Sequence, residues 1–311
     1  MLIRGALYRN VVFKIFFADD LNAWRKFDAG IAHSTMLTEM DKCQRELHLW
    51  GSANKVSFDK EKEGMYVLSR KRPHGPSFNL LGVSFDCKLV MSATVEDLAK
   101  TCRWKLKAIL RTSRFNTGAG LIDMYKAQIL SFIECRTAAI YHVCDSALAL
   151  LDGVQDKVLF VAGMSKAEAF NEVNLAPLGV RRDIAMLGVI HRAALGCGPE
   201  HFREFFRADV VARREKRSKH ALQLLPLENH VSDFMLPGSA PANYIEHSAH
   251  GLIRVYNLLS ASVVERSPCV KTFQSALQQL VRSRAKDACS DLEHTLSPRI
   301  PPSRHPLRHL R

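Results

Sequence analysis

The stretch KIFFADDLNAW (residues 14–24) carries two adjacent acids inside a largely apolar run. Neighbouring carboxylates repel each other and lose hydration in such surroundings, so something must compensate for them. Residues 11–17 just before the pair are mostly β-branched or aromatic, which is typical of a β-strand. We therefore predict a strand that ends at the acids, then a turn and a second strand.

The N-terminal residues also fit a second interpretation. Arg4, Arg9 and Lys14, with no acid before Asp19, suit a mitochondrial presequence. The β-branched and aromatic run favours the strand.

After it, the apolar positions Leu37, Met40, Leu47 and Trp50 recur at helical spacing, which predicts a helix over residues 31–54 with Trp50 as a core anchor. Residues 56–58 and 65–68 then suggest extended chain around a charged turn, and residues 78–86 suggest another short strand.

From residue 91 the pattern is mostly helical. A helix predicted over residues 95–114 has an apolar face made by Leu98, Cys102, Leu106 and Ile109. Its opposite face carries cations alone: Lys100, Arg103, Lys107, Arg111 and Arg114. Because a merely solvated face usually mixes both signs, phosphate contact and simple solubility are both open interpretations.

Further helices are predicted over residues 121–142, 148–160, 245–260 and 272–287, with more helical pattern over 168–207. Within that region Asp183 is a candidate helix start. The basic run 213–220 is interpreted as an exposed segment. The Pro-, Arg- and His-rich tail from Ser297 is expected to be disordered, because it offers little to bury.

Composition narrows the possible partners. The chain has 311 residues and a net charge of +13, which favours a polyanion, either nucleic acid or a membrane surface. No run of about 20 apolar residues is present, so a membrane span is not expected. The eight cysteines form no CxxC pair, and we expect reduced thiols. His191, Cys197 and His201 lie close in sequence but are interpreted as core or surface residues rather than metal ligands.

Several motifs occur in an order that points to a family. FFADDLNAW (residues 16–24) resembles the [FY]xDD signature of reverse transcriptases, and residues 43–68 resemble the helix and strand after it in non-LTR (LINE-type) retrotransposon enzymes. Within that segment Trp50, Asn54, Phe58 and Lys62 match the W…N…F…K pattern. FNLLGVSFD (78–86) resembles the hairpin that supports the primer end, and residues 174–196 resemble the segment after the thumb. The resemblance covers roughly residues 10–205.

This resemblance implies an α+β fold: an incomplete palm, made of a short antiparallel sheet and a helix, followed by a helical thumb and further C-terminal helices. The implied domains are a partial palm at 1–90, a thumb at 91–165, a helical region at 166–290 and a disordered basic tail at 291–311.

The resemblance also assigns roles. It implies an RNA-directed DNA polymerase that acts on an RNA template, a DNA primer and deoxynucleoside triphosphates, inside the cell and without membrane attachment. Asp19 and Asp20 would hold two Mg²⁺ or Mn²⁺ ions, and Lys62 would protonate departing pyrophosphate. Phe17 and Ala18 would shape the hairpin beneath the primer terminus, and Leu81 and Gly82 would form the primer grip. The cations Lys100, Arg103, Lys107, Arg111 and Arg114 would face the template–primer duplex.

One part of the family pattern is missing. The family carries a fingers region and another metal-binding aspartate upstream of its signature, whereas the 18 residues before Asp19 include no acid. With two acidic ligands instead of three the metals would be under-coordinated, so we expect the chain alone to polymerise poorly or not at all. The alternatives are a non-catalytic nucleic-acid-binding protein that uses the cationic face, or a relic without a biochemical role.

Overall fold

The computed structural model describes residues 13–17, 20–28, 30–59, 61–200, 202–209, 219–226, 247–286 and 292–309. The chain divides into two compact units, unit 1 (residues 1–90) and unit 2 (residues 91–311). Its described part is mainly helical, with short antiparallel strands, so the expected mixture of helices and antiparallel strands is confirmed. The division falls where the predicted partial palm ends. Residues 91–165 and 166–290, predicted as separate domains, belong to one unit.

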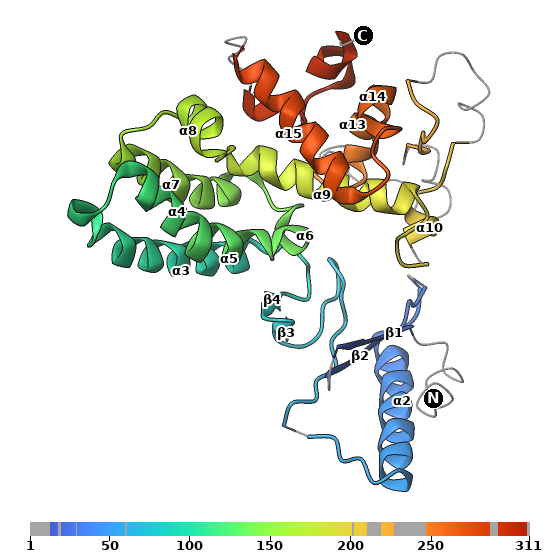
Figure 1. The fold of residues 1–311 in the computed structure, drawn as a ribbon. Coiled ribbons are helices and arrows are strands. Elements are labelled where there is room, and N and C mark those ends of the chain that lie inside the picture. Colours follow the sequence, from blue (N-terminus) through green and yellow to red (C-terminus); the bar gives the residue numbers. More distant parts are fainter. Residues whose placement is uncertain are drawn as a thin grey trace. The chain divides into compact units, whose positions relative to one another are not determined.

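Unit 1 consists of two hairpins and one long helix (Figure 1). Its elements are β1 (Phe13–Phe17), β2 (Asp20–Trp24), α2 (His33–Ala53), β3 (Phe78–Leu80) and β4 (Val83–Phe85). Each hairpin is a separate two-stranded antiparallel sheet. The predicted order of strand, turn, strand and helix at the start of the chain is therefore confirmed.

The end of α2 is fixed by its own sequence. The side-chain amide of Asn54 donates to the carbonyl of Trp50 at 2.8 Å, and Lys55 adopts a left-handed φ of 58°. The chain then folds back, because the amide of Val56 donates to the carbonyl of Gly51 at 2.8 Å. A Cβ atom on Gly51 would lie 2.6 Å from the oxygen of Val56 and 2.9 Å from the ring of Phe58. Only glycine fits this close return.

Residues 56–68 do not form the predicted extended strands. Val67 makes an isolated bridge with His74, and no other described residue of this segment pairs in a sheet. The β-branched and aromatic residues there lie on either side of the charged run 59–63, and among the described residues no strand pairs with them in a ladder. The pattern-based prediction of a single strand over residues 78–86 is wrong, because β3 and β4 form a hairpin there, as the family resemblance implies.

Unit 1 buries little. Its buried side chains include Cys43, Val83 and Cys87. Larger apolar groups stay open to solvent, such as Trp24 at 41% exposure, Leu49 at 71% and Leu81 at 55%. Trp50, expected as a core anchor, is only half-buried. Ring contacts and a few hydrogen bonds therefore hold much of this unit, for example the stacked rings of Phe78 and Phe85 across β3 and β4.

Unit 2 begins with helices that pack around one another. Its elements are α3 (Ser92–Leu110), α4 (Gly118–Tyr125), a π-helical segment (Lys126–Leu130), α5 (Ser131–Glu134), α6 (Thr137–Ile140), α7 (Asp145–Ala162), α8 (Lys166–Val173), α9 (Leu178–Ala194), α10 (Phe202–Phe205), α13 (Gly251–Leu258), α14 (Ala261–Val264), α15 (Val270–Lys286) and three short 3-10 turns within residues 292–309.

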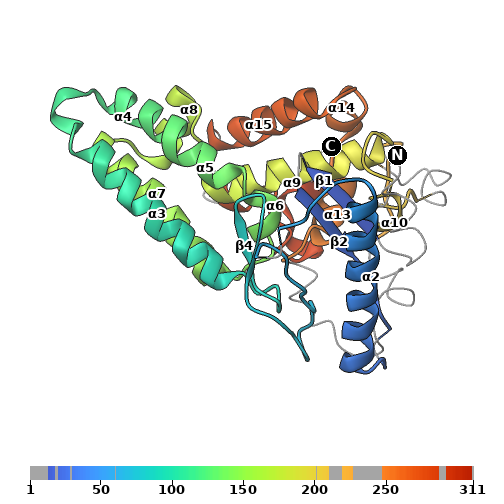
Figure 2. The ribbon, with the colours of Figure 1, turned by 90° about the horizontal axis from the view of Figure 1, so that it is seen from below.

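The first group joins α3, α4 and α7, and α3 and α7 run side by side in both ribbon views (Figures 1 and 2). The predicted apolar face of α3 is confirmed, since Leu98, Cys102, Leu106 and Ile109 are all buried. Gly118 lets the start of α4 meet the end of α7, because a Cβ there would lie 2.6 Å from the carbonyl oxygen of Ala162. Because α3 packs on α4 and α7 through its apolar face, its opposite face is exposed to solvent.

The second group packs α15 and α13 against α9. Its core includes Leu187, Tyr256 and Phe273, each with no exposed surface. His191 belongs to this core: its ring stacks on Phe273 at 4.1 Å, and its nitrogens contact the Tyr256 hydroxyl at 3.0 Å and the Ser267 carbonyl at 2.8 Å. His191 is therefore a core residue, one of the two positions that the sequence suggested for it.

Several predicted helix boundaries differ from the structure. The helix predicted over residues 121–142 is broken, because a π-helical segment follows α4 and the chain turns again after Glu134. Asp183 does not start a helix. The N-cap of α9 is Pro177, and Asp183 lies in the second turn of the helix. The carboxylate of Asp183 accepts a 2.6 Å hydrogen bond from the buried Tyr141 hydroxyl.

The C-terminal tail was predicted to be disordered, and that prediction is wrong for residues 292–309. Leu296 and Leu307 join the core of α9, α13 and α15, and His305 is buried beside them. The Nε2 atom of His305 lies 3.2 Å from the carbonyl of Ser297. A few apolar residues at the right spacing therefore anchor a segment whose overall composition is basic and proline-rich.

Candidate nucleic-acid interface

The β1–β2 hairpin carries the acidic pair that the sequence singles out. The strands pair from Phe13 with Trp24 to Phe17 with Asp20, so Asp20 begins β2 directly opposite the end of β1. Ala18 and Asp19, which connect them in sequence, lie outside the described residues, as do the side chains of Phe17 and Asp20. The backbone register thus has Asp20 at the end of a hairpin, and the metal-binding role of Asp19 and Asp20 stays a prediction.

Metal ligands can be assessed only in the described part of the chain. No group of three or more His, Cys, Asp or Glu side chains is arranged there to hold an ion. Mg²⁺ prefers octahedral oxygen coordination and binds proteins through carboxylates supplemented by water and substrate phosphates. Asp19 and the side chain of Asp20 lie outside the described residues, so the coordination of a metal by this pair stays a prediction.

The β3–β4 hairpin turns at the predicted primer-grip residues. Leu81 and Gly82 both have positive φ, 50° and 76°, as a tight two-residue hairpin turn requires. Leu81 is more than half exposed, and a Cβ on Gly82 would meet nothing within 4 Å. The turn therefore leaves space beside the Cα of Gly82, and its role at a primer stays a prediction.

Lys62 lies in an exposed turn. Its ammonium nitrogen is 3.5 Å from a carboxylate oxygen of Asp59, three residues earlier. This matches a simple surface lysine as well as a mobile general acid, so its catalytic role stays a prediction. The matched pattern around it does have a structural meaning, because Asn54 caps α2 and Phe58 packs over Gly51.

The cationic face of α3 is the best-defined candidate site. Its five predicted residues are all exposed: Lys100, Arg103, Lys107, Arg111 and Arg114. Lys100 is paired with Asp97 at 2.9 Å. In the described part of the chain, Arg103, Lys107 and Arg111 form no ion pair. They are free to neutralise the charge of a polyanion.

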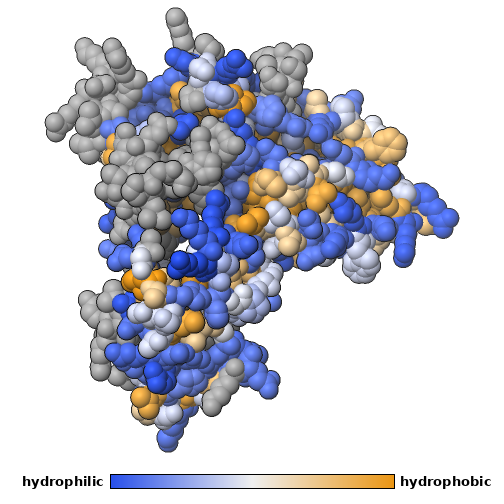
Figure 3. All heavy atoms as spheres, turned by 180° about the vertical axis from the view of Figure 1, so that it is seen from behind, coloured by the Kyte–Doolittle hydropathy of each residue, from blue (hydrophilic) through white to orange (hydrophobic). Residues whose placement is uncertain are grey.

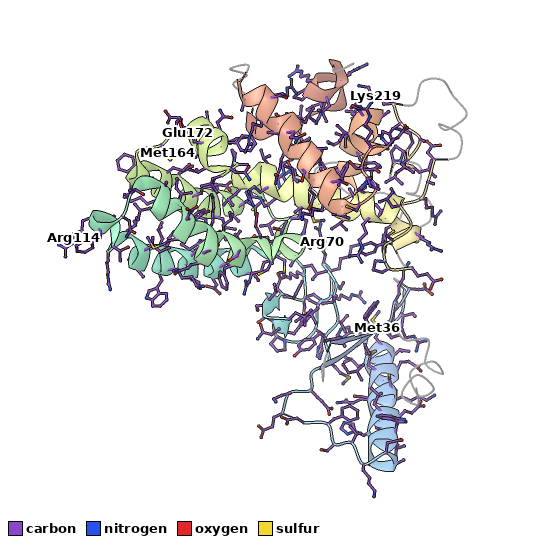
Figure 4. All side chains as sticks on the ribbon, in the orientation of Figure 1. Met36, Arg70, Arg114, Met164, Glu172 and Lys219 are labelled. Carbon is purple, nitrogen blue, oxygen red and sulfur yellow. The ribbon has the colours of Figure 1, made fainter. Side chains whose placement is uncertain are left out.

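Arg114 lies beyond the end of α3 and projects away from the helical group (Figure 4). Its guanidinium carbon sits 4.6 Å from the ring centroid of Phe115, which is 74% exposed. An arginine over an open aromatic ring gives a surface that combines charge with a stacking face. Arg114 is thus not part of α3 itself, but it continues the cationic row beyond the C-terminal end of the helix.

Sequence reasoning missed one residue of this face. Trp104 is 71% exposed and lies among the cations, one turn from Lys100 and from Lys107. Figure 3 shows other hydrophobic residues at the surface of the helical region, so exposure of an apolar group is not unusual there. A tryptophan within a row of free cations is more specific, and the signal was present in the sequence RWKLK (103–107).

A cavity of about 330 Å³ also lies in unit 2, between α7, the start of α9 and residues 293–300. Its charged walls are paired internally: Arg182 with Asp152 at 3.1 Å, and Lys166 with both Asp156 and Glu293. Burial raises the pKa of Asp183 to about 7. Most of the charged groups that line this cavity are therefore engaged with one another, and we assign no ligand to it.

Comparisons of the chain with protein-family models, with curated proteins and with solved structures find no match. The resemblance to reverse transcriptases therefore depends on the sequence motifs. Among the described residues, no helix is both long and apolar enough to cross a membrane.

Proposed function

We propose that this chain is the C-terminal part of a reverse transcriptase of the non-LTR retrotransposon type, and that it binds nucleic acid through the outer face of α3. The observation that carries the binding is the row of exposed cations Arg103, Lys107 and Arg111, which have no ion-pair partner in the described residues. Each could release condensed counterions from a nucleic acid on binding, which is a large source of affinity for a basic protein.

Three further features support the reverse-transcriptase part of the proposal. The β1–β2 register ends at Phe17 and Asp20, so the signature occurs at a hairpin end. The LG sequence forms the tight turn of a second hairpin. The two hairpins, the intervening α2 and the helical segment after them follow in the order that the motifs imply.

The same features limit the activity. Asp19 and Asp20 alone do not complete a two-metal site, so we assign no nucleotidyl-transfer step to this chain. Its own residues would bind and orient nucleic acid. Binding and polymerisation are therefore expected to separate: the purified chain binds an RNA–DNA template–primer but does not extend it.

The experiment measures both properties on one sample. Binding of a template–primer is followed by anisotropy, and extension is followed with deoxynucleoside triphosphates and Mg²⁺ or Mn²⁺. We expect binding that persists in chelator and weakens steeply with salt, without incorporation. Robust incorporation that Asp19→Ala abolishes would contradict the assigned incompleteness, and absence of binding at low salt would contradict the proposal as a whole.

The second candidate is a nucleic-acid-binding protein with no polymerase ancestry. It is favoured by the position of the α3 face on unit 2, which has its own core and does not need the acidic hairpin. Mn²⁺ binding followed by electron paramagnetic resonance separates the two. Weak binding that is lost in an Asp19→Asn, Asp20→Asn variant supports the polymerase origin, and metal binding that is absent or unchanged in the variant supports the second candidate.

A further inference from the structure

Two aromatic residues beside the α3 cations, Phe132 and Trp104, differ in whether their rings contact other side chains. The ring of Phe132, on α5, is covered by the ammonium of Lys105 at 4.2 Å and by the guanidinium of Arg136 at 3.9 Å. Trp104, the neighbour of Lys105, has an indole that makes no hydrogen bond and no ring or cation contact with any described residue. One aromatic ring is therefore already occupied, and the other presents its face to solvent.

The surroundings of Trp104 specify what could cover that face. Lys100 lies four residues before it, Lys107 three residues after it and Arg111 seven residues after it, so all three share its side of the helix. The acids at the start of α3, Glu96 and Asp97, lie about two turns away, and Asp97 is already paired with Lys100. The charged residues within one turn of the indole are therefore all cations, which suit a partner that has both negative charge and flat aromatic groups.

We propose that the outer face of α3 binds single-stranded nucleic acid, with Trp104 stacking on an unpaired base while Arg103, Lys107 and Arg111 contact phosphates. This inference rests on the proposed nucleic-acid binding and specifies its substrate. Bases in a duplex already stack on their neighbours, so their flat faces are not available to a protein ring. An unpaired base can use the indole face, and such stacking tolerates any sequence.

A second exposed ring, which one cation already contacts, extends the same path. Phe115 follows α3 by five residues, is 74% exposed and lies under the guanidinium of Arg114. From Lys100 to Arg111 the helix rises about 16 Å, at about 1.5 Å for each residue. A strand laid along this row would thus meet Trp104 and the phosphate-binding cations first, and then Phe115 at the end of the helix. Basic residues combined with stacking aromatics are what bind single strands without sequence preference.

The test compares one labelled oligoribonucleotide, single-stranded or annealed to its complement, as a ligand of the full chain. Trp104→Ala is expected to weaken single-strand binding at least about tenfold. It should leave the dependence of affinity on salt unchanged, because no charge is removed. Trp104→Phe should retain most of the affinity, since it keeps an aromatic face. Leu49→Ala, which truncates an apolar side chain of equal exposure in unit 1, is the matched control and should change nothing.

Indole fluorescence gives a second readout, because the chain has three tryptophans and only Trp104 lies on this face. Single strands should quench the emission of the parent chain and not that of Trp104→Ala.

If Trp104→Ala binds single strands as well as the parent does, while charge removal at Arg103, Lys107 and Arg111 abolishes binding, the stacking inference fails and the proposed function stands. If no variant and no parent chain binds nucleic acid, both fail. If vesicles of anionic phospholipid quench Trp104 and oligonucleotides do not, the face is a membrane surface and the inference is overturned.

Discussion

The two units of this chain keep their shape in different ways. Unit 2 has a continuous core in which α9, α13, α15 and the last residues of the described chain bury Leu187, Phe273, Leu296 and Leu307. Unit 1 buries little beyond Cys43, Val83 and Cys87 and leaves most of its large side chains at least partly open. Unit 2 can thus hold a surface in place by itself, whereas the hairpins of unit 1 depend on local bonds and turn chemistry.

This difference bears on function. The candidate binding face belongs to α3, whose opposite side is buried in the core of the first helical group. The candidate metal-binding hairpin belongs to the unit without a sizeable core. This distribution of packing favours a chain that binds nucleic acid but does not polymerise.

Ending the chain after Asp291 should unfold unit 2. The truncation removes two leucines with almost no exposed surface, Leu296 and Leu307, together with the buried His305. Deleting one buried leucine side chain costs roughly 2–5 kcal/mol, and a whole domain is stable by only about 5–15 kcal/mol. Thermal unfolding followed by circular dichroism should lose its cooperative transition. A chain ending at His309 is the control, and a truncated chain with an unchanged transition would show that the tail is not part of the core.

A single core substitution should distinguish the units. Phe273→Ala should lower the free energy of unfolding by roughly 3–5 kcal/mol, because it leaves a cavity beside His191 in unit 2. Leu49→Ala in unit 1 should change it by less than about 0.5 kcal/mol, since that side chain is mostly in solvent. Denaturant titration measures both. Equal effects would mean that the cores of the two units do not differ as described.

Sequence patterns were most informative where the structure is local. The order of strand, turn and strand around Asp20 and the buried face of α3 were predicted from periodicity and residue type. The burial of Leu296 and Leu307 could not be predicted, because it depends on contacts with helices far away in sequence. The exposure of Trp104 was also not predicted. An aromatic residue in a helix is usually assigned to the core, and only packing shows which ones are left outside.

The pH dependence of unit 2 should contain a contribution from Asp183. Burial raises the pKa of this carboxyl from 3.8 to about 7, above its value in the unfolded chain. Below about pH 4 the carboxyl is protonated in both states, and the stability of the fold is fully present. As the pH rises to about 7 the unfolded chain loses this proton more readily than the folded one, so stability is lost. Asp183→Asn removes that loss and should raise the stability at pH 8 by up to about 4 kcal/mol relative to the parent.

Three buried histidines act in the opposite direction. Burial lowers the pKa of His191, His220 and His305, so they favour the folded state at neutral pH and lose that contribution as the pH falls below about 6.5. The difference between the parent and Asp183→Asn isolates the aspartate, because both chains keep the histidines. Asp123→Asn, at an exposed position, is the control. Parallel stability curves for the parent and Asp183→Asn would contradict the assignment.

Two glycine substitutions should have opposite signs. Gly51→Ala places a Cβ against the Val56 carbonyl and the Phe58 ring, so it should open the return of the chain after α2 at a cost of about 1–3 kcal/mol. Faster hydrogen exchange of the Val56 amide, which donates to Gly51, would report it. Gly153→Ala lies in α7 with open space around it and should stabilise unit 2 by about 0.5–1 kcal/mol. Destabilisation by Gly153→Ala, or unchanged exchange of Val56, would contradict this packing.

The central claim, that nucleic acid binds to the outer face of α3, is tested most directly by the salt dependence of binding. The parent chain is compared with an Arg103→Ala, Lys107→Ala, Arg111→Ala variant and with a control that removes Lys42, Arg45 and Lys71, three exposed cations of unit 1. For a single strand, the slope of log affinity against log salt should fall in magnitude by about 2 in the α3 variant and stay unchanged in the control. An unchanged slope in the α3 variant, or an equal loss in the control, would contradict the claim.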